Sequence, residues 1–472
     1  MKKDLLLSLR GGEELTLRQQ TLLALQLSIP AILAQVSSIA MQYIDSSMVG
    51  HLGREASAAI GLVASSTWLL SGLCRALTVG FCVQTAQRIG AGDERDARNL
   101  VRQGLIIGVI FGLVLALAGI AVSGSLPRWL GAEASIWQGA SVYFLIFALS
   151  LPALQLNSLA AALLQAGGNM RTPSVLLVLM CGLDVVFNLL FIFPSRQIGS
   201  FTLPGADLGV AGAALGTALA EVVVACIMCA CLLRSPMLGL RKSEKLRFVP
   251  EQLKRAVRLG IPVAIEQMVM SGGQIVTTGI IAPLGTVSIA ANSFAVTAES
   301  LCYMPGYGIG NAATTVVGQS VGARRKDLAR SFANLSVILG IGVMSAMAVI
   351  MYALCPMVFA LLTPDAQVRV LAAEVLRLEL FAEPLYAASI VVSGALRGAR
   401  DTLIPSLLNL VSIWGVRIPL SLWLVGPMGL AGAWIAMAVE LCVRGILLLI
   451  RQLRGRWLDI IEQKPLEKGM MR

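Results

Sequence analysis

Long apolar stretches are the feature that most restricts what this chain can fold into. The stretches at residues 104–126 and 210–233 each exceed the roughly 20 residues that a helix needs to cross the hydrocarbon core of a membrane. Only 13% of the 472 residues are charged, about half the share found in soluble globular proteins. We therefore expect an integral membrane protein. The first 20 residues are polar, so we expect no cleavable signal peptide.

The spacing of the apolar stretches predicts twelve transmembrane helices and an all-α fold. Charged and turn-forming residues separate the stretches and set the approximate ends of each helix. The predicted spans are residues 21–49, 57–87, 101–126, 136–165, 173–194, 208–233, 259–282, 287–317, 331–361, 376–396, 404–424 and 429–450.

The basic residues predict the orientation of these helices. Most of the 37 Lys and Arg residues lie in the loops on the same side as the N-terminus, and the richest loop is residues 234–258. Because cytoplasmic loops of membrane proteins concentrate Lys and Arg, both termini are predicted to be cytoplasmic. The net charge of +11 thus reflects topology and not nucleic-acid binding. We expect a multi-pass protein of the plasma membrane, in bacteria the inner membrane, that contacts membrane lipids.

The cysteine and histidine content limits the possible chemistry. The nine cysteines fall inside apolar segments, where small polarisable side chains pack well. Cys226, Cys229 and Cys231 have the spacing of metal ligands but no His or carboxylate beside them, so we interpret them as packing residues. With His51 as the single histidine, His-based catalysis is excluded. We predict no bound cofactor and no enzymatic activity.

The chain contains an internal repeat. At one constant spacing, landmarks of the first half fall on the same residue types in the second half, and a slightly shorter spacing aligns the last helix of each half. The coinciding landmarks include Ile29-Pro30 with Ile261-Pro262, Gly90-Ala91 with Gly322-Ala323, Pro152 with Pro384, and residues 209–213 with 429–433.

The repeat predicts the domain organisation. Each copy holds six spans, an even number, so both copies enter the membrane in the same direction. We predict two parallel six-helix lobes that form a V around a central cleft, which is typical of carriers that work by alternating access. The predicted parts are an N-terminal lobe (1–233), a basic cytoplasmic linker (234–258), a C-terminal lobe (259–450) and a basic cytoplasmic tail (451–472).

Four polar residues within the predicted spans of the N-terminal lobe are candidates for an ion-coupling site: Asp45, Asp184, Asn188 and Thr217. Charges inside a membrane are costly and usually functional. Asp184 and Asn188 lie one turn apart on one helix face, and all four groups fall at a similar depth. Their oxygens could bind a hard cation such as Na⁺. Alternatively the carboxyls could hold a proton, or the four side chains could form a hydrogen-bonded cluster that only joins helices.

The repeat makes this candidate site asymmetric. The positions that correspond to Asp45, Asp184 and Asn188 in the second half are Thr277, Val416 and Leu420. Scaffold residues therefore repeat and the carboxylates do not, as expected if one lobe carries the coupling ion.

Other residues in the spans are candidates for the substrate cleft. Arg75 could equally extend its charge to the membrane surface. Arg417, Glu440 and Arg444 are interpreted instead as a structural ion-pair network, and the glycines of residues 306–310 as a site of close helix packing and not a nucleotide-binding loop. The cleft candidates are Arg75, Glu266, Gln267, Met270, Glu299, Tyr307, Glu383 and Tyr386.

Several motifs, in order along both halves, resemble those of the multidrug and toxic compound extrusion (MATE) family, and the resemblance extends over essentially the whole chain. The first motif runs from Ile29-Pro30 through Asp45 and continues with residues 48–53. The others are Gly90-Ala91-Gly92, Ala290-Ala291-Asn292-Ser293, Met304-Pro305-Gly306, Val317-Gly318-Gln319, Leu396-Arg397-Gly398 with Asp401-Thr402, and Arg417-Ile418-Pro419.

This resemblance implies an antiporter that exports amphipathic, often cationic drugs in exchange for H⁺ or Na⁺. It also implies a cation site at Asp45, Asp184, Asn188 and Thr217, although Asp184 and Asn188 stand in exchanged places relative to the family pattern. Some family members have a Glu on helix 7 and an Asp on helix 10, where this chain has Met270 and Tyr386.

Two other functions remain as alternatives. A lipid-linked precursor flippase of the same superfamily would use a strongly cationic cleft, for which Arg75 is the main candidate. A membrane enzyme or receptor subunit would need a catalytic motif or a large domain outside the membrane, and neither is visible. The expected partners are small amphipathic molecules and lipids, with no nucleic acid, and the protein is expected to be monomeric.

Overall fold

The computed structural model of this protein describes residues 5–10, 14–131, 133–198, 201–239, 241, 244 and 247–459. Residues 240, 242, 243, 245 and 246 of the predicted linker and residues 460–472 of the predicted tail lie outside this set. The chain divides into two compact units. We call Val36–Thr85 with Glu94–Gly260 the N-terminal unit, and Met1–Gln35 with Ala86–Asp93 and Ile261–Arg472 the C-terminal unit.

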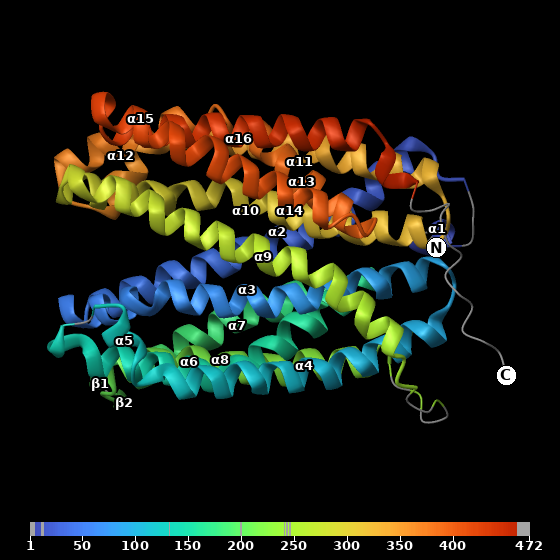
Figure 1. Cartoon of the computed structure of the whole chain (residues 1–472). Helices are drawn as coiled ribbons and strands as arrows, with labels where there is room; N and C mark the ends of the chain where they lie inside the picture. The colour runs from blue at the N-terminus through green and yellow to red at the C-terminus, as the bar shows by residue number, and fades with distance from the viewer. Residues whose placement is uncertain are drawn as a thin grey trace. The chain divides into compact units, whose positions relative to one another are not determined.

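Helices account for nearly all of the regular structure in the first half of the chain (Figure 1). Each of the first six predicted spans corresponds to one long helix. The elements are α1 (Leu5–Arg10), α2 (Leu17–Gly50), α3 (Arg54–Gly90), α4 (Glu94–Ser123), α5 (Leu126–Trp129), α6 (Ala134–Ala166), α7 (Arg171–Phe191), β1 (Pro194–Ile198), β2 (Phe201–Ala206) and α8 (Gly209–Leu233).

The second half repeats the pattern with more interruptions. Its fourth span is broken into α12 and α13, and its fifth contains a π-helical turn. The elements are α9 (Pro250–Ile281), η1 (Ala282–Leu284), α10 (Thr286–Gly322), α11 (Lys326–Leu362), α12 (Ala366–Glu379), α13 (Glu383–Gly398), α14 (Leu403–Ser412), η2 (Ile413–Arg417), α15 (Ile418–Met428), α16 (Leu430–Leu453) and η3 (Arg456–Leu458).

Nine helices of the described chain are long and apolar enough to cross a membrane, counting α14 to α15 as one. The other three predicted spans correspond to α9, α10 and the pair α12–α13. Neither helix of this pair is long enough to cross a membrane by itself, because the two have 14 and 16 residues. Several predicted boundaries also shift, most of all those of the seventh and tenth spans. The seventh helix begins at Pro250 and not at residue 259, and the tenth span begins at Ala366 and not at residue 376.

The start of α12 was missed because its first turns are amphipathic and not apolar. Asp365 caps this helix, and its carboxylate accepts hydrogen bonds from the backbone N–H groups of Gln367 and Val368 at 2.9 and 3.3 Å. Pro384 is the first-turn proline of α13, whereas its repeat partner Pro152 lies inside the continuous helix α6. The repeated proline therefore lies within one continuous helix in the first half of the chain, and at the break between two helices in the second half.

The N-terminal unit packs through small residues on α4. This helix lies beside α6, and α6 lies beside α8, which in turn contacts α7 (Figure 1). A Cβ added at Gly112 would lie 2.8 Å from the Cα of Pro152, and one at Gly119 would lie 2.8 Å from the Cβ of Ala148. Because the helix backbones approach so closely, neither position can hold a larger side chain without separating α4 from α6.

The C-terminal unit uses the same device between α10 and α13. A Cβ added at Gly398 would lie 2.5 Å from the backbone oxygen of Thr314, and one at Gly308 would lie 2.7 Å from the backbone nitrogen of Ile32 on α2. The glycines of residues 306–310 thus serve close helix packing, as predicted.

A short antiparallel hairpin follows α7, where the sequence predicted only a loop. Strands β1 and β2 pair Ile198 with Phe201 and Pro194 with Ala206, with an irregularity in the register near Pro194. The apolar span was predicted to continue to residue 194, but α7 ends at Phe191. The fold is otherwise helical throughout the described residues.

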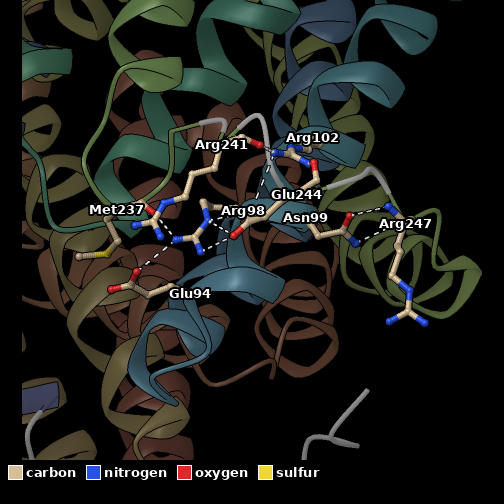
Figure 2. Close-up of polar contacts among 8 residues, drawn as sticks. All are labelled: Glu94, Arg98, Asn99, Arg102, Met237, Arg241, Glu244 and Arg247. Atoms are coloured by element: carbon tan, nitrogen blue, oxygen red, sulfur yellow. Dashed lines mark hydrogen bonds and ion pairs between the residues drawn. The ribbon is translucent and has the colours of Figure 1, made fainter. Parts of the chain in front are cut away.

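The linker docks on the start of α4 within the N-terminal unit (Figure 2). Arg98 donates to the carboxylate of Glu244 from Nη2 at 2.7 Å and from Nε at 3.0 Å, and also to Glu94 at 3.1 Å. Asn99 exchanges two hydrogen bonds with the backbone of Arg247, at 2.8 and 3.0 Å. Hydrogen bonding to Arg98 lowers the pKa of the Glu244 carboxyl below its usual value. This part of the linker is therefore a docked segment.

Candidate functional site

The candidate coupling residues Asp184 and Asn188 lie one turn apart on the buried face of α7. Their side chains are 0% and 1% exposed, and this face packs against α8 in the N-terminal unit. The spacing of four residues places both groups on one side of the helix, as the sequence predicted. An Asp this deeply buried requires a hydrogen-bond donor, a proton or a cation as compensation.

Asn188 joins the two carboxylates of the site. Its Nδ2 donates to Oδ1 of Asp45, which comes from α2, at 2.9 Å, and to Oδ2 of Asp184 at 3.1 Å. The shared amide thus holds the Asp45 and Asp184 carboxyls near each other. The structure thus brings together three of the four predicted residues, and we call Asp45, Asp184 and Asn188 the coupling cluster.

The coupling cluster has unused acceptor atoms. Within the described residues, Oδ1 of Asp184 and Oδ1 of Asn188 are buried without any hydrogen-bond partner. Asn188 Oδ1 rests against Gly216 of α8, where an added Cβ would collide with it. Two buried oxygens that face no donor are a suitable partial coordination shell for a hard cation, and a proton on either carboxyl would satisfy a similar need.

Thr217, the fourth predicted residue, does not contact the cluster through its hydroxyl. Its Oγ1 donates to the backbone oxygen of Ala213 at 3.2 Å, one turn earlier on α8. Threonine in a helix commonly forms this bond. The neighbouring Gly216, which the sequence analysis did not single out, is the α8 residue that lies against Asn188.

No basic side chain balances the coupling cluster among the described ion pairs, none of which includes Asp45 or Asp184. Two carboxyls held by one amide, one of them the fully buried Asp184, cannot both be ionised without a counter-charge. The arrangement can therefore bind a positive ion or share a proton.

Four of the predicted cleft residues in the C-terminal unit line one small hollow that is partly open to solvent. Glu266, Met270, Tyr307 and Tyr386 line it, together with Asn311 and other polar residues. The Glu266 carboxylate accepts hydrogen bonds from Arg397 at 3.0 and 3.1 Å, Ser406 at 2.7 Å and Asn409 at 2.6 Å. Its charge is thus already compensated within the protein.

A second small hollow lies in the same unit. Glu299, Met270 and Tyr386 line it, as does Arg417 at the end of the π-helical turn. The predicted ion-pair network is confirmed beside it. Arg417 Nη2 lies 2.9 Å and Arg444 Nε 3.0 Å from the carboxylate of Glu440, which is fully buried.

The remaining cleft candidates lie elsewhere. Arg75 is exposed on α3, Gln267 is half-buried on α9, and neither lines the two hollows. Glu383 is fully buried at the start of α13, and within the described residues its two carboxyl oxygens have no hydrogen-bond partner. The same holds for Glu379 at the end of α12, a residue that the sequence analysis overlooked.

The sequence analysis also overlooked a buried pair on α6 and α8. Nδ2 of Asn157 donates to Oε1 of Glu221 at 2.7 Å, and the two residues are 4% and 7% exposed. Glu221 lies inside the stretch 210–233 that was treated as apolar. The rule that a charge within a span marks function would have identified it.

The described residues contain no cluster of three or more His, Cys, Asp or Glu side chains that could hold a metal ion. All nine cysteines are free; Cys74, Cys302 and Cys355 are buried, whereas Cys226 is exposed. The coupling cluster has two carboxylates and an amide, and is therefore suited to a weakly bound monovalent cation more than to a resident metal.

The model of one protein family, described as MatE, matches residues 30–190 and 262–423, one match in each half. Among relatives, the probable multidrug resistance protein NorM of Thermotoga maritima is 26% identical over 438 residues and covers 92% of both chains. The protein of the same name from Mannheimia succiniciproducens is 28% identical over 448 residues, covering 90% of this chain and 92% of its own.

Solved structures show the same fold. An outward-facing multidrug resistance MATE family transporter of the MOP superfamily has a TM-score of 0.87 and 22% identity, covering 98% of this chain and 100% of its own. A MOP superfamily transporter from Pyrococcus furiosus has a TM-score of 0.86 and 22% identity over 98% and 99%. The predicted twelve-helix architecture is confirmed by this similarity.

Proposed function

The chain belongs to the MatE family, and we propose that it is a cation-coupled antiporter that exports amphipathic, often cationic compounds by alternating access. It is a multi-pass membrane transporter and not an enzyme. The relatives named as probable multidrug resistance proteins support export of toxic compounds. H⁺ and Na⁺ both remain candidates for the coupling ion.

The coupling cluster is the observation that carries this proposal. The Asp45 and Asp184 carboxyls share the amide of Asn188 and have no basic partner among the described ion pairs. Two buried acceptor oxygens of the cluster face no donor within the described residues. A cation or proton bound there neutralises the cluster, and its release restores the repulsion between Asp45 and Asp184. A carrier uses such a difference in charge to favour one conformation over another.

The position of Asp45 on α2 lets ion binding act on both units of the protein. Residues of α2 up to Gln35 belong to the C-terminal unit, and those from Val36 belong to the N-terminal unit. Pro30 lies inside this helix near the change, and prolines mark places where membrane helices bend. Loading of Asp45 therefore acts on a helix that contributes to both units.

The two hollows of the C-terminal unit are the proposed substrate site. Tyr307, Tyr386 and Met270 offer aromatic and polarisable surface to an amphipathic cation. Glu299 adds a carboxylate to the second hollow. Polar side chains such as Asn311 and Thr277 stand beside these aromatic residues, so the hollows offer both kinds of surface to an amphipathic compound.

A lipid-linked precursor flippase is less well supported. It would need free positive charge to hold a phosphate-bearing headgroup. The arginines that line the hollows are paired instead: Arg397 with Glu266, and Arg417 and Arg444 with Glu440. We further propose a plasma-membrane location with both termini cytoplasmic, a monomer that contacts lipids, and no cofactor or nucleic-acid partner.

Dye efflux from proteoliposomes, driven separately by a pH gradient and by a sodium gradient, tests the proposal. One of the gradients should drive export, and Asp45→Asn should abolish gradient-driven export while the protein remains folded and inserted. Asp365→Asn is the matched control, since it also removes one carboxylate but leaves a residue that caps α12 equally well. Undiminished gradient-driven export by Asp45→Asn would refute the proposed role.

A further inference from the structure

Glu221 is a buried carboxyl that the coupling cluster does not use. It lies on α8, four residues after Thr217 and thus on the same helix face, about 6 Å further along the axis. Its side chain is 7% exposed and accepts a hydrogen bond of 2.7 Å from Asn157 of α6. The repeat partners of Asn157 and Glu221 are Ser389 and Leu441. This pair, like the coupling cluster, belongs to one half of the chain only.

The groups around Glu221 supply no positive charge. The neighbouring helix α7 contributes the carboxyl of Asp184, α3 contributes the thiol of Cys74, and α6 contributes the neutral amide of Asn157. None of the ion pairs among the described residues includes Glu221. Because an isolated buried carboxylate is very costly, such a group normally holds a proton.

The amide of Asn157 can serve both charge states of Glu221. As placed, Nδ2 donates to Glu221 and lies 3.8 Å from the sulfur of Met180, while Oδ1 is buried with no hydrogen-bond partner among the described residues. An amide offers two donors on one end and two acceptor sites on the other. Rotation of the amide about its last torsion would let Oδ1 accept the O–H of a protonated Glu221.

Asn157 also links this pair to the coupling cluster. Met180, which it contacts, lies one turn before Asp184 on the same face of α7. The carboxyls of Glu221 and Asp184 interact electrostatically with each other. A positive ion bound at either carboxyl therefore changes the charge that the other experiences.

We propose that Glu221 and Asn157 form a second proton-binding position in the N-terminal unit, electrostatically linked to the coupling cluster. An oxygen of Glu221 takes a proton from water, forming an O–H bond that Asn157 accepts, and returns it to water as the ionised carboxylate that Asn157 stabilises through Nδ2. The proposal rests on the proposed function of the coupling cluster. It adds one titrating carboxyl to the N-terminal unit and makes ion exchange depend on pH even where Na⁺ occupies the coupling cluster.

Proton counting on the purified, full-length protein tests this position directly. A weakly buffered sample carrying a pH indicator is shifted from mildly alkaline to mildly acidic pH, and proton uptake per chain is measured. Glu221→Gln keeps the size of the side chain and cannot ionise, so uptake should fall by about one proton per chain. Glu133→Gln is the control, because it makes the same substitution at an exposed Glu just before α6, outside the buried interior of the N-terminal unit.

Infrared difference spectra between the same two pH values give a second readout. The carbonyl stretch of a protonated carboxyl should appear in the wild-type protein, disappear in Glu221→Gln and shift in Asn157→Leu, which removes the amide partner. An unchanged proton count together with an unchanged carbonyl band in Glu221→Gln would overturn the inference. If Glu221→Gln does not insert, an unshifted band in Asn157→Leu overturns it instead.

The two proposals fail in different ways. Absence of gradient-driven dye export by the wild-type protein, with the Glu221 signals present, would refute the antiporter proposal and leave the proton position intact. Normal coupled export, with the Glu221 signals absent, would refute the second position alone.

Discussion

A single methyl group at Gly216 provides a sharp test of the coupling cluster. A Cβ at this position would collide with Oδ1 of Asn188 and lie 3.1 Å from its Cγ. The amide must then leave its place or α7 must move away from α8. In either case Asn188 can no longer hold both carboxyls at 2.9 and 3.1 Å. We therefore predict that Gly216→Ala disables ion coupling without changing any ionisable residue.

The size of this effect follows from the oxygen that the ion would lose. Oδ1 of Asn188, which the added Cβ displaces, is one of the two buried acceptor oxygens that face no donor. An interaction between a neutral polar group and a charge contributes about 1.5–3 kcal/mol net, so we expect a loss of up to about 3 kcal/mol. Since 1.4 kcal/mol corresponds to a factor of ten, ion affinity should fall by up to roughly a hundredfold.

Ion-driven dye efflux from proteoliposomes, measured over a series of ion concentrations, is the assay. Gly216→Ala should need up to roughly a hundredfold more coupling ion for half-maximal efflux. Gly182→Ala is the matched control, because an added Cβ on this α7 glycine meets no atom within 4 Å. Wild-type ion dependence in Gly216→Ala, or an equal loss in both variants, would refute the role assigned to the contact between Asn188 and Gly216.

Three further predictions concern the scaffold. Glu440→Gln leaves two buried guanidiniums without their carboxylate and should cost about 3–5 kcal/mol, seen as a lower thermal midpoint in detergent, whereas the exposed Glu374→Gln should change it little. Gly112→Ala should destabilise the protein by about 1–3 kcal/mol through its clash with Pro152, whereas Gly342→Ala, whose added Cβ meets no atom within 4 Å, should not. Equal thermal unfolding midpoints for the two variants would contradict the packing argument. Because Arg98 lowers the pKa of Glu244, docking of the linker gains stability above the ordinary carboxyl pKa and loses it as pH falls through the lowered value. Protection of residues 247–249 against hydrogen exchange, corrected for the intrinsic rate at each pH, should accordingly be high at neutral pH, fall in acid, and be low at every pH in Glu244→Gln.

The sequence predicted membrane insertion, the twelve spans and the duplicated plan because these depend on composition and periodicity. It predicted Asp184 and Asn188 on one face because helix geometry is regular. It failed at the start of α12, where amphipathic turns carry no apolar signal, and at β1 and β2, which are too short and too polar to stand out between two apolar spans. It also passed over Glu221, because one charge hardly alters the apolar character of a long stretch.

Which polar groups meet was decided by tertiary structure alone. The sequence placed Thr217 in the cluster, yet its hydroxyl bonds to its own helix, and Gly216 is the residue in contact with Asn188. It marked Glu266 as a cleft residue, and the structure shows that carboxylate bound by Arg397, Ser406 and Asn409 from other helices. The physical reason is that apolar spans and their depth are properties of each helix, whereas partners are set by how helices rotate and pack against one another.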